Sequence, residues 1–251
     1  MKNIITTATL LAAGSVLACA ELSSATMWTN IPEGDASGTT IKSWNVTGSG
    51  LNWSDGSLWS IAFTVDAADI LVADTATLLS IKGQDQTFSA LAAVTLSDGS
   101  VSIPAYTGTS TPVALGDISS SNITFVLSRV STARDTVNLT LVGYGDGNFE
   151  QELFSTNLDC TGALMFSNRA FGALEFGGYS LANNDMVSRI PSNNEAEAFD
   201  LLAAAYWTGG TVGNDDLVSY YASAIPEPSA FGLLAGLGVL AHVGARRRRS
   251  R

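Results

Sequence analysis

The chain has 251 residues, 46% of them hydrophobic and 14% charged, and a formal net charge of −11 at pH 7. This length is sufficient for one well-packed domain, and the acidic balance argues against binding nucleic acid or anionic lipid through the protein's electrostatic field. The only histidine is His242, so the rest of the chain has no imidazole for a Ser-His-Asp or Cys-His mechanism or for the usual zinc site.

The N-terminus has the pattern of an export leader. Lys2 precedes an apolar stretch over residues 4–18, and Ala18-Cys19-Ala20 fits the small-x-small rule of signal peptidase. Residues 1–20 are therefore predicted to be a signal peptide that is removed on export. An alternative interpretation takes residues 16–19 as a lipobox in which Cys19 is lipidated, although Leu17 is unusual at its position.

The body between the two ends is more acidic than the whole chain. Lys2 gives the leader a charge of +1 and residues 226–251 contribute +4, which leaves −16 for residues 21–225. Cys160 is the only cysteine of this body, so no intramolecular disulfide is expected despite an oxidising compartment. We expect Cys160 to be a small buried apolar residue and not a nucleophile.

Residues 21–210 have the pattern of an all-β domain, predicted here to be an antiparallel β-sandwich. Short apolar or alternating segments recur between Gly, Asp, Ser and Thr. Asp55-Gly56, Asp98-Gly99 and Asp146-Gly147 are hairpin signals. The predicted strands cover residues 58–65, 76–82, 91–96, 101–105, 122–129, 136–143, 162–166 and 172–176.

One helix is predicted late in the domain. The capping-box spacing from Ser192 to Glu195 precedes a stretch rich in alanine and leucine that runs to Trp207. Gly209 and Gly210 would end this helix. Residues 211–225 are predicted to be a linker or a final edge strand.

The body resembles the concanavalin A-like, laminin-G-like jelly rolls of bacterial surface proteins. The resemblance is carried by the tryptophan-led strand 59–65, by Leu-Leu-Ser-Ile at 78–81, by the Ser-Asp-Gly turn at 97–99 and by the segment ending in Ala205-Tyr206. It covers roughly residues 40–211. It implies two curved antiparallel sheets whose concave face or rim loops bind glycans or proteins, often beside calcium.

Two groups of side chains are candidates for ligand binding. Trp44, Trp53 and Trp59 lie near Asn45, Asn52 and Asp55, a mixture of aromatic and polar groups that suits sugar rings, although tryptophans in a sandwich usually belong to the core. Acidic side chains offer hard oxygen ligands for calcium, but solvated aspartates are the default interpretation. These candidates are Asp66, Asp69 and Asp74, and separately Asp215 and Asp216.

The carboxylates do not form the pattern of a glycosidase. Hydrolases of this fold carry acids at alternate positions of one strand. Glu150 and Glu152 have that spacing but lack a third carboxylate. Glu195, Glu197 and Asp200 fit a helix N-terminus, where acids stabilise the helix dipole. We therefore expect no enzymatic activity.

The C-terminal segment, residues 226–251, combines three physical features in order. Pro226 and Pro228 flank Glu227 and hold an extended peptide that neither helix nor sheet can absorb. An apolar run over residues 230–245 follows and is predicted to be a short transmembrane helix. Four arginines then favour the cytoplasmic side of a membrane; they are Arg246, Arg247, Arg248 and Arg249.

This order resembles the PEP-CTERM sorting signal of Gram-negative bacteria that make extracellular polysaccharide. The resemblance implies that a membrane-embedded exosortase recognises Pro226, Glu227 and Pro228, removes the tail, and releases or anchors the protein. The expected route passes through the inner membrane to the cell surface, outer membrane or extracellular matrix. An ordinary C-terminal membrane anchor is the alternative.

The sequence favours an exported, non-enzymatic surface or matrix protein with exopolysaccharide as a candidate contact. A lectin-like carbohydrate-binding module is the second hypothesis, and a secreted glycoside hydrolase is the third and least favoured. No cofactor is required by any of these interpretations, and nucleic acid is not an expected partner.

Overall fold

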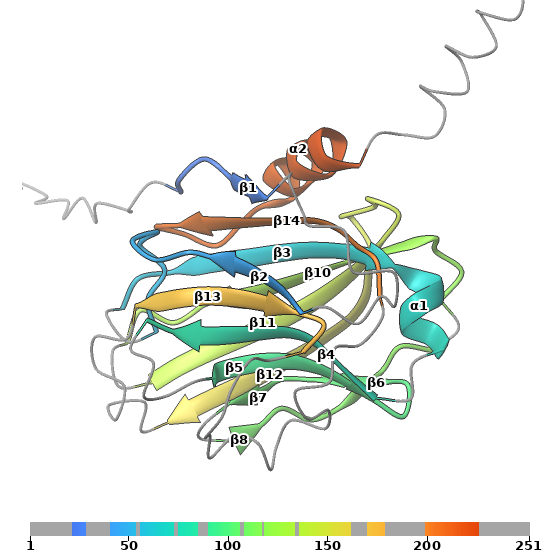
Figure 1. The fold of residues 1–251 in the computed structure, drawn as a ribbon, viewed down its shortest axis with the longest axis horizontal. Helices are drawn as coiled ribbons and strands as arrows, with labels where there is room; N and C mark the ends of the chain where they lie inside the picture. Colours follow the sequence, from blue (N-terminus) through green and yellow to red (C-terminus); the bar gives the residue numbers. More distant parts are fainter. Residues whose placement is uncertain are drawn as a thin grey trace, which may run out of the picture.

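The structure is a computed structural model that describes residues 22–28, 41–53, 56–72, 75–84, 90–105, 108–116, 118–133, 136–161, 170–178 and 199–225. These residues form two antiparallel sheets packed face to face, together with two helices (Figure 1). The predicted leader, Asp74, residues 195–198 and the segment 226–251 lie outside the described residues. The expectation of an antiparallel all-β domain is confirmed.

The first sheet, called sheet A, has six strands, and its strand pairs are all antiparallel. Residues 122–129 and 136–143 were predicted from their period-2 alternation, and both form strands. In spatial order the strands are β1 (Thr26–Trp28), β14 (Leu201–Thr208), β3 (Trp59–Asp66), β10 (Asn122–Arg129), β11 (Thr136–Gly145) and β12 (Glu152–Thr161).

The second sheet, called sheet B, has eight strands, six of which follow one another in a single path. The Asp98-Gly99 turn between β5 and β6 was predicted correctly; both residues have positive φ, at 51° and 67°, as a type I′ hairpin turn requires. The path is β2 (Lys42–Asn45), β13 (Phe171–Phe176), β4 (Thr75–Gly83), β5 (Ala90–Ser97), β6 (Ser100–Ser102) and β9 (Val113–Ala114), with β7 (Pro104–Ala105) beside β5 and β8 (Gly108–Thr109) beside β7.

The main core lies between the two sheets. On β11 the buried side chains of Val137, Leu139 and Leu141 alternate with more exposed neighbours, as one strand face against a core requires. The rings of Phe63 in sheet A and Phe176 in sheet B meet edge to face with centroids 5.5 Å apart, so side chains of both sheets share one core.

The predicted late helix is wrong over its described part. Residues 201–208 form β14, which pairs with β3 on one side and with β1 on the other. Alanine and leucine favour a helix locally, but the pairing with two strands overrides that preference. Ala203 and Ala205 lie in a cluster with the C-terminal helix, where small side chains let the helix approach the sheet.

The helices stand where sequence analysis predicted none. The helix α1 (Ala67–Val72) follows β3 directly. The helix α2 (Asn214–Ala224) replaces the predicted linker or edge strand. Asp215 and Asp216 occupy its first turn, where negative charge stabilises the helix dipole. In the ranges that the structure describes, neither helix has the length and apolar content needed to cross a membrane.

Candidate functional site

The helix α2 packs on the outer face of sheet A, the face turned away from sheet B (Figure 1). Leu217 and Tyr220 are its buried side chains, and Tyr220 is only 1% exposed. The Tyr220 ring contacts the Trp207 ring edge to face, with centroids 6.0 Å apart. A second, smaller hydrophobic cluster therefore holds α2 against β3, β10 and β14.

A chain of buried hydroxyl groups lies under the helix. The Tyr220 hydroxyl shares a hydrogen bond of 3.0 Å with Oγ1 of Thr64, and Thr64 shares one of 2.9 Å with Thr124. Burial raises the pKa of Tyr220 above its ordinary value of 10, although the hydrogen bond to Thr64 opposes this shift. The hydroxyl therefore stays protonated and keeps its place in the chain of hydrogen bonds.

The segment before α2 is fixed in the same way. The backbone N–H of Val212 donates to Oγ of Ser60 at 3.0 Å, and Ser60 shares a 2.7 Å hydrogen bond with Ser128 on β10. Ser60 and Ser128 are buried polar residues on the outer face of sheet A. The segment before α2 can bury these two hydroxyl groups without a penalty because each of them has a hydrogen-bond partner.

The first described residues join the same cluster. The N–H of Ser23 donates to the carbonyl of Thr208 at 2.8 Å, and the N–H of Thr208 donates back to Oγ of Ser23 at 2.8 Å. Leu22 and Ile225 both pack against the small cluster under α2. The two ends of the folded body therefore meet on the outer side of sheet A.

The folded body ends next to the predicted sorting motif. Ile225 is the C-cap of α2; its N–H donates to the carbonyl of Tyr221 at 2.9 Å, and its backbone is extended with φ −121° and ψ 93°. A residue before proline is forced into this extended region, and proline has no N–H to continue a helix. Pro226 therefore accounts for the end of α2.

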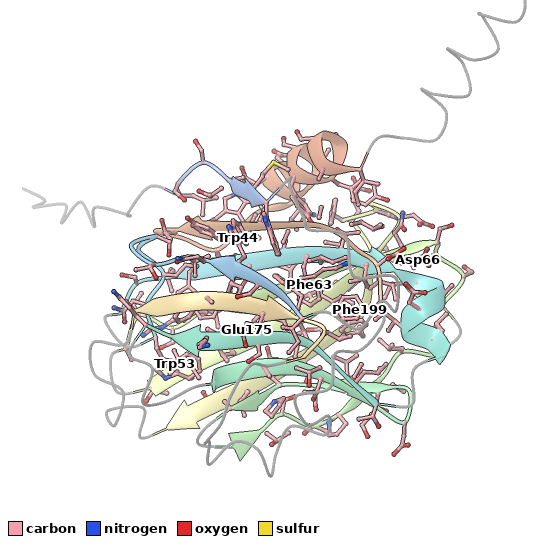
Figure 2. All side chains as sticks on the ribbon, viewed as in Figure 1. Trp44, Trp53, Phe63, Asp66, Glu175 and Phe199 are labelled. Carbon is pink, nitrogen blue, oxygen red and sulfur yellow. The ribbon has the colours of Figure 1, made fainter. Side chains whose placement is uncertain are left out.

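The three tryptophans proposed as a glycan platform do not form one. Figure 2 shows two of them, Trp44 and Trp53, apart from each other in the molecule. Trp53 is 1% exposed and Trp59 is fully buried, so neither can contact a sugar, and this prediction is wrong. Trp59 Nε1 donates to the carbonyl of Asn52 at 2.9 Å. The strand carrying Trp59 is buried on both faces because sheet B covers one and the C-terminal segment the other.

Trp44 is partly buried and packs against two other aromatic rings. Its ring stacks on Trp28, with centroids 5.6 Å apart, and contacts Tyr206 at 5.2 Å. These three partly buried rings come from β2, β1 and β14 and pack against the main core. They close the sandwich along one edge. Sequence analysis missed Trp28 and Tyr206 because this cluster depends on pairing between β1 and β14.

Two of the aspartates considered for calcium, Asp66 and Asp69, accept hydrogen bonds from backbone N–H groups. Asp66 Oδ1 accepts a hydrogen bond from the N–H of Ala68 at 2.8 Å, and Asp69 Oδ2 accepts one from the N–H of Asp200 at 2.8 Å. Both bonds hold the β3–α1 corner. Within the described part of the chain, no three His, Cys, Asp or Glu side chains gather closely enough to hold a metal ion.

Buried charges have structural partners. Arg129 is fully buried, and its guanidinium donates to the carbonyls of Trp53, Ser131 and Ala133 at 2.7 to 3.0 Å. Glu175 is buried beside Lys82, with 3.6 Å between Oε1 and Nζ. Sequence analysis did not single out these residues. Arg129 fixes two loops by satisfying their carbonyls.

A comparison with known protein families agrees with the position of the sorting motif that the sequence predicted after residue 225. Residues 224–249 match the family model of the PEP-CTERM protein-sorting motif. The chain therefore carries the sorting signal that its Pro-Glu-Pro, apolar and arginine segments predicted, and this signal implies export and membrane-associated processing by an exosortase. No match to the chain is found among curated proteins.

Solved structures show only distant similarity. A Trypanosoma rangeli sialidase in complex with sialic acid has 12% identity and a TM-score of 0.45, over 73% of this chain and 26% of the sialidase. The binding domain of botulinum neurotoxin serotype D has 8% identity and a TM-score of 0.39, over 80% of this chain and 47% of that domain's chain. A family 7 alginate lyase, A1-II′, has 12% identity and a TM-score of 0.34, over 72% of this chain and 77% of the lyase. The chain thus spans about a quarter of the sialidase's length.

Proposed function

We propose that this protein is an exported, non-enzymatic cell-surface or extracellular-matrix protein that an exosortase trims or anchors at Pro226, Glu227 and Pro228. The observation that carries the proposal is the junction at Ile225, the C-cap of a packed helix, which lies immediately before the Pro-Glu-Pro tripeptide of the matched motif. The adjacent proline keeps the recognised peptide out of helix and sheet.

The remaining parts of the signal have separate physical tasks. The apolar run after Ser229 enters the inner membrane, and the arginine cluster stays on the cytoplasmic side because charged side chains cross the bilayer at high cost. Translocation then stops with the folded body outside and the tripeptide at the membrane surface. The exosortase is the expected partner, and the cell surface or matrix is the expected destination.

We also infer that the body is a concanavalin A-like jelly roll that acts by contact and not by turnover. Glu150 and Glu152, the first of the two carboxylate groups weighed for catalysis, are both exposed. Arg129 and Glu175, the charged groups buried in the described body, are committed to structural partners. A carbohydrate-binding module is the second candidate, and a cavity on sheet A favours it.

Double substitution of Pro226→Ala and Glu227→Ala in the native host tests the processing step. We expect the precursor to accumulate in the inner membrane and retain its tail, as measured by intact mass and by fractionation with an antibody against the body. Ser223→Ala is the matched control, since this exposed residue lies on α2 three positions before the motif. Normal trimming of the double variant would refute the proposal.

A further inference from the structure

The outer face of sheet A is covered unevenly. The segment containing Val212 and α2 covers β14, β3 and the nearby parts of β10 and β11. The first half of β11 and the paired second half of β12 lie beyond this cover. Among the strands that the structure describes, β12 is also the last one of sheet A.

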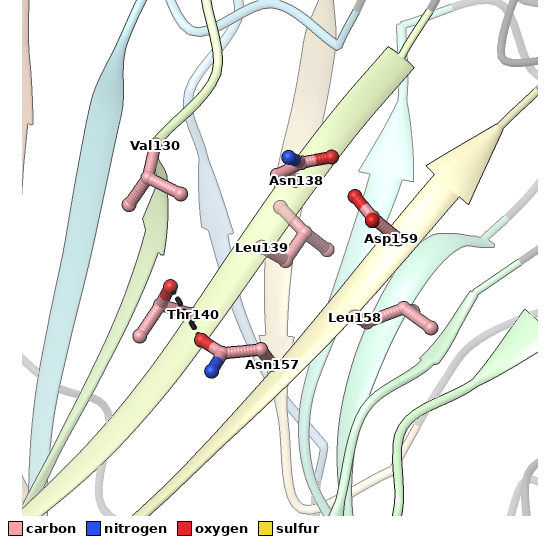
Figure 3. A pocket seen from close by; sticks show the side chains of 7 residues that line it. All are labelled: Val130, Asn138, Leu139, Thr140, Asn157, Leu158 and Asp159. Carbon is pink, nitrogen blue, oxygen red and sulfur yellow. Dashed lines mark hydrogen bonds between the residues drawn. The ribbon is translucent and has the colours of Figure 1, made fainter.

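A cavity of about 310 Å³ opens on this uncovered part (Figure 3). Its volume is at the lower end of the range of about 300–1,000 Å³ that small-molecule sites occupy. The residues that line it come from the position directly after β10, from β11 and from β12. They are Val130, Asn138, Leu139, Thr140, Asn157, Leu158 and Asp159.

Strand register brings the polar side chains of the cavity together. Asn138 pairs with Asp159 and Thr140 pairs with Asn157 across β11 and β12. Because alternate residues of a strand point to the same face, all four side chains stand on the outer face of sheet A. Figure 3 shows them facing one another across the two strands.

The hydrogen bonds of these four residues leave specific groups available. Thr140 Oγ1 donates to Asn157 Oδ1 at 2.8 Å, which orients the amide and leaves its Nδ2 as a donor. Asn138 Oδ1 is buried and has no hydrogen-bond partner. Leaving a buried acceptor unpaired is costly, and such a group in a native protein needs an explanation.

We propose that this cavity binds a sugar residue of a neutral glycan. Sugar hydroxyls are both donors and acceptors, so one can donate to Asn138 Oδ1 or to the Asp159 carboxylate while another accepts from Asn157 Nδ2. Val130, which is 47% exposed, offers an apolar surface for the sugar's C–H groups. The proposal assigns the unpaired Asn138 oxygen a partner that the protein itself lacks.

The charge of the site excludes acidic sugars. Asp159 is exposed at the cavity and the body carries a net charge of −16, so a uronic acid would meet like charge. A divalent cation is also disfavoured, because a single carboxylate lines the cavity and calcium prefers several oxygen ligands of higher charge. The site therefore selects for hydroxyl groups.

The test is binding of the full-length chain, in a detergent without a sugar headgroup, to an array of oligosaccharides. The probes are neutral oligomers of glucose, galactose, mannose and N-acetylglucosamine, and matched oligomers that contain uronic acids. We expect binding to at least one neutral probe, with Kd then measured by titration calorimetry. Binding to no neutral probe, a preference for the acidic probes, or binding only when calcium is added would each overturn the proposal.

Variants locate the site. Asn157→Ala and Asp159→Ala should each weaken binding about tenfold, because each removes a hydrogen bond to the sugar. Ser155→Ala is the matched control, since Ser155 is exposed on the same face of the same strand and does not line the cavity. Equal affinity in the two cavity variants and the control would overturn the assignment.

Asn138→Leu separates binding from folding. Removing the unpaired oxygen should abolish binding while the melting temperature stays at or above that of the wild type, because an apolar side chain of similar size needs no partner. A lowered melting temperature with unchanged binding would contradict the role given to Asn138. The inference rests on the proposed function only for the source of the glycan, and since it is measured on purified protein, its failure is distinguishable from a failure of exosortase processing.

Discussion

The two halves of the outer face of sheet A use similar polar residues in opposite ways. Under α2, Thr64 and Thr124 are buried and hydrogen-bonded to each other, and Thr64 is also hydrogen-bonded to Tyr220, a residue of the chain itself. On the uncovered half, Asn138 has a buried oxygen without a partner and Asp159 is exposed. The difference shows that hydroxyl and amide groups on a strand do not specify their own environment; the segment that packs above them does.

Tyr220→Ala should have the largest effect, because it removes the ring that fills the small cluster and leaves Thr64 without one of its partners. We expect a loss of about 3–5 kcal/mol in the free energy of unfolding, the usual cost of truncating a buried aromatic residue. Thermal and denaturant unfolding measure it. Val218→Ala on the same helix is the control, since Val218 is 52% exposed and should change stability by less than about 0.5 kcal/mol. Equal losses would mean that α2 is not held by its buried face.

Gly147→Ala tests the close approach of α2 to the turn after β11. Gly147 has φ +72°, and an added Cβ would lie 2.7 Å from Cδ1 of the Tyr221 ring. Gly99→Ala is a matched control, because Gly99 also follows an aspartate with positive φ but has open space around it. The control should lose about 1–2 kcal/mol from backbone strain, and Gly147→Ala about 1–3 kcal/mol more from overpacking. Equal unfolding energies in the two variants would contradict the contact.

Tyr220→Phe isolates the hydroxyl from the ring. We expect a loss of about 1 kcal/mol near neutral pH, because Thr64 keeps its bond to Thr124. Burial raises the pKa of Tyr220 in the folded state above the value of 10 in the unfolded state. The contribution of its hydroxyl to stability is therefore fully present below pH 10 and is lost as the pH rises beyond that value. The free energy of unfolding, measured from pH 8 to 11, should therefore fall less steeply with pH in the variant than in the wild type. Tyr144, whose pKa burial and Glu152 also raise, gives the same background slope in both proteins.

Thr140→Val should have the smallest effect on stability. The bond from Thr140 to Asn157 is exposed, so its loss should change the free energy of unfolding by less than about 0.5 kcal/mol. Glycan affinity should nevertheless fall about threefold, because the Asn157 amide is no longer oriented. If stability fell while affinity was unchanged, the bond would serve only the fold.

The sequence predicted the parts of the fold that depend on local pattern. Residues 136–143 were recognised as a strand because alternation reports a half-buried surface directly, and Asp98-Gly99 as a turn because few residues adopt positive φ. Residues 201–208 were misassigned as a helix because they are rich in alanine. These small side chains let α2 pack closely on the strand, and they do not indicate a helical backbone here. The helix at 214–224 was missed because Gly213 and two aspartates also fit a linker.

The candidate sites divide in the same way. The Pro-Glu-Pro signal is linear, so its residues could be identified without a structure. The positions of Trp53 and Trp59 depend on which elements cover each face of β3, and sequence spacing carries no such information. Asn138, Thr140, Asn157 and Asp159 could not be grouped from sequence, because only the register of β11 with β12 brings them together.

The meeting of Leu22 and Ile225 at one cluster has a practical consequence for labelling this protein. A reporter fused immediately before Leu22 or after Ile225 would press on the packing that holds α2. The hairpin tip at Asp98-Gly99 is on the other sheet, and a side chain added at Gly99 would meet no atom within 4 Å. A short epitope inserted at that tip should follow the protein from synthesis to its destination without disturbing either end.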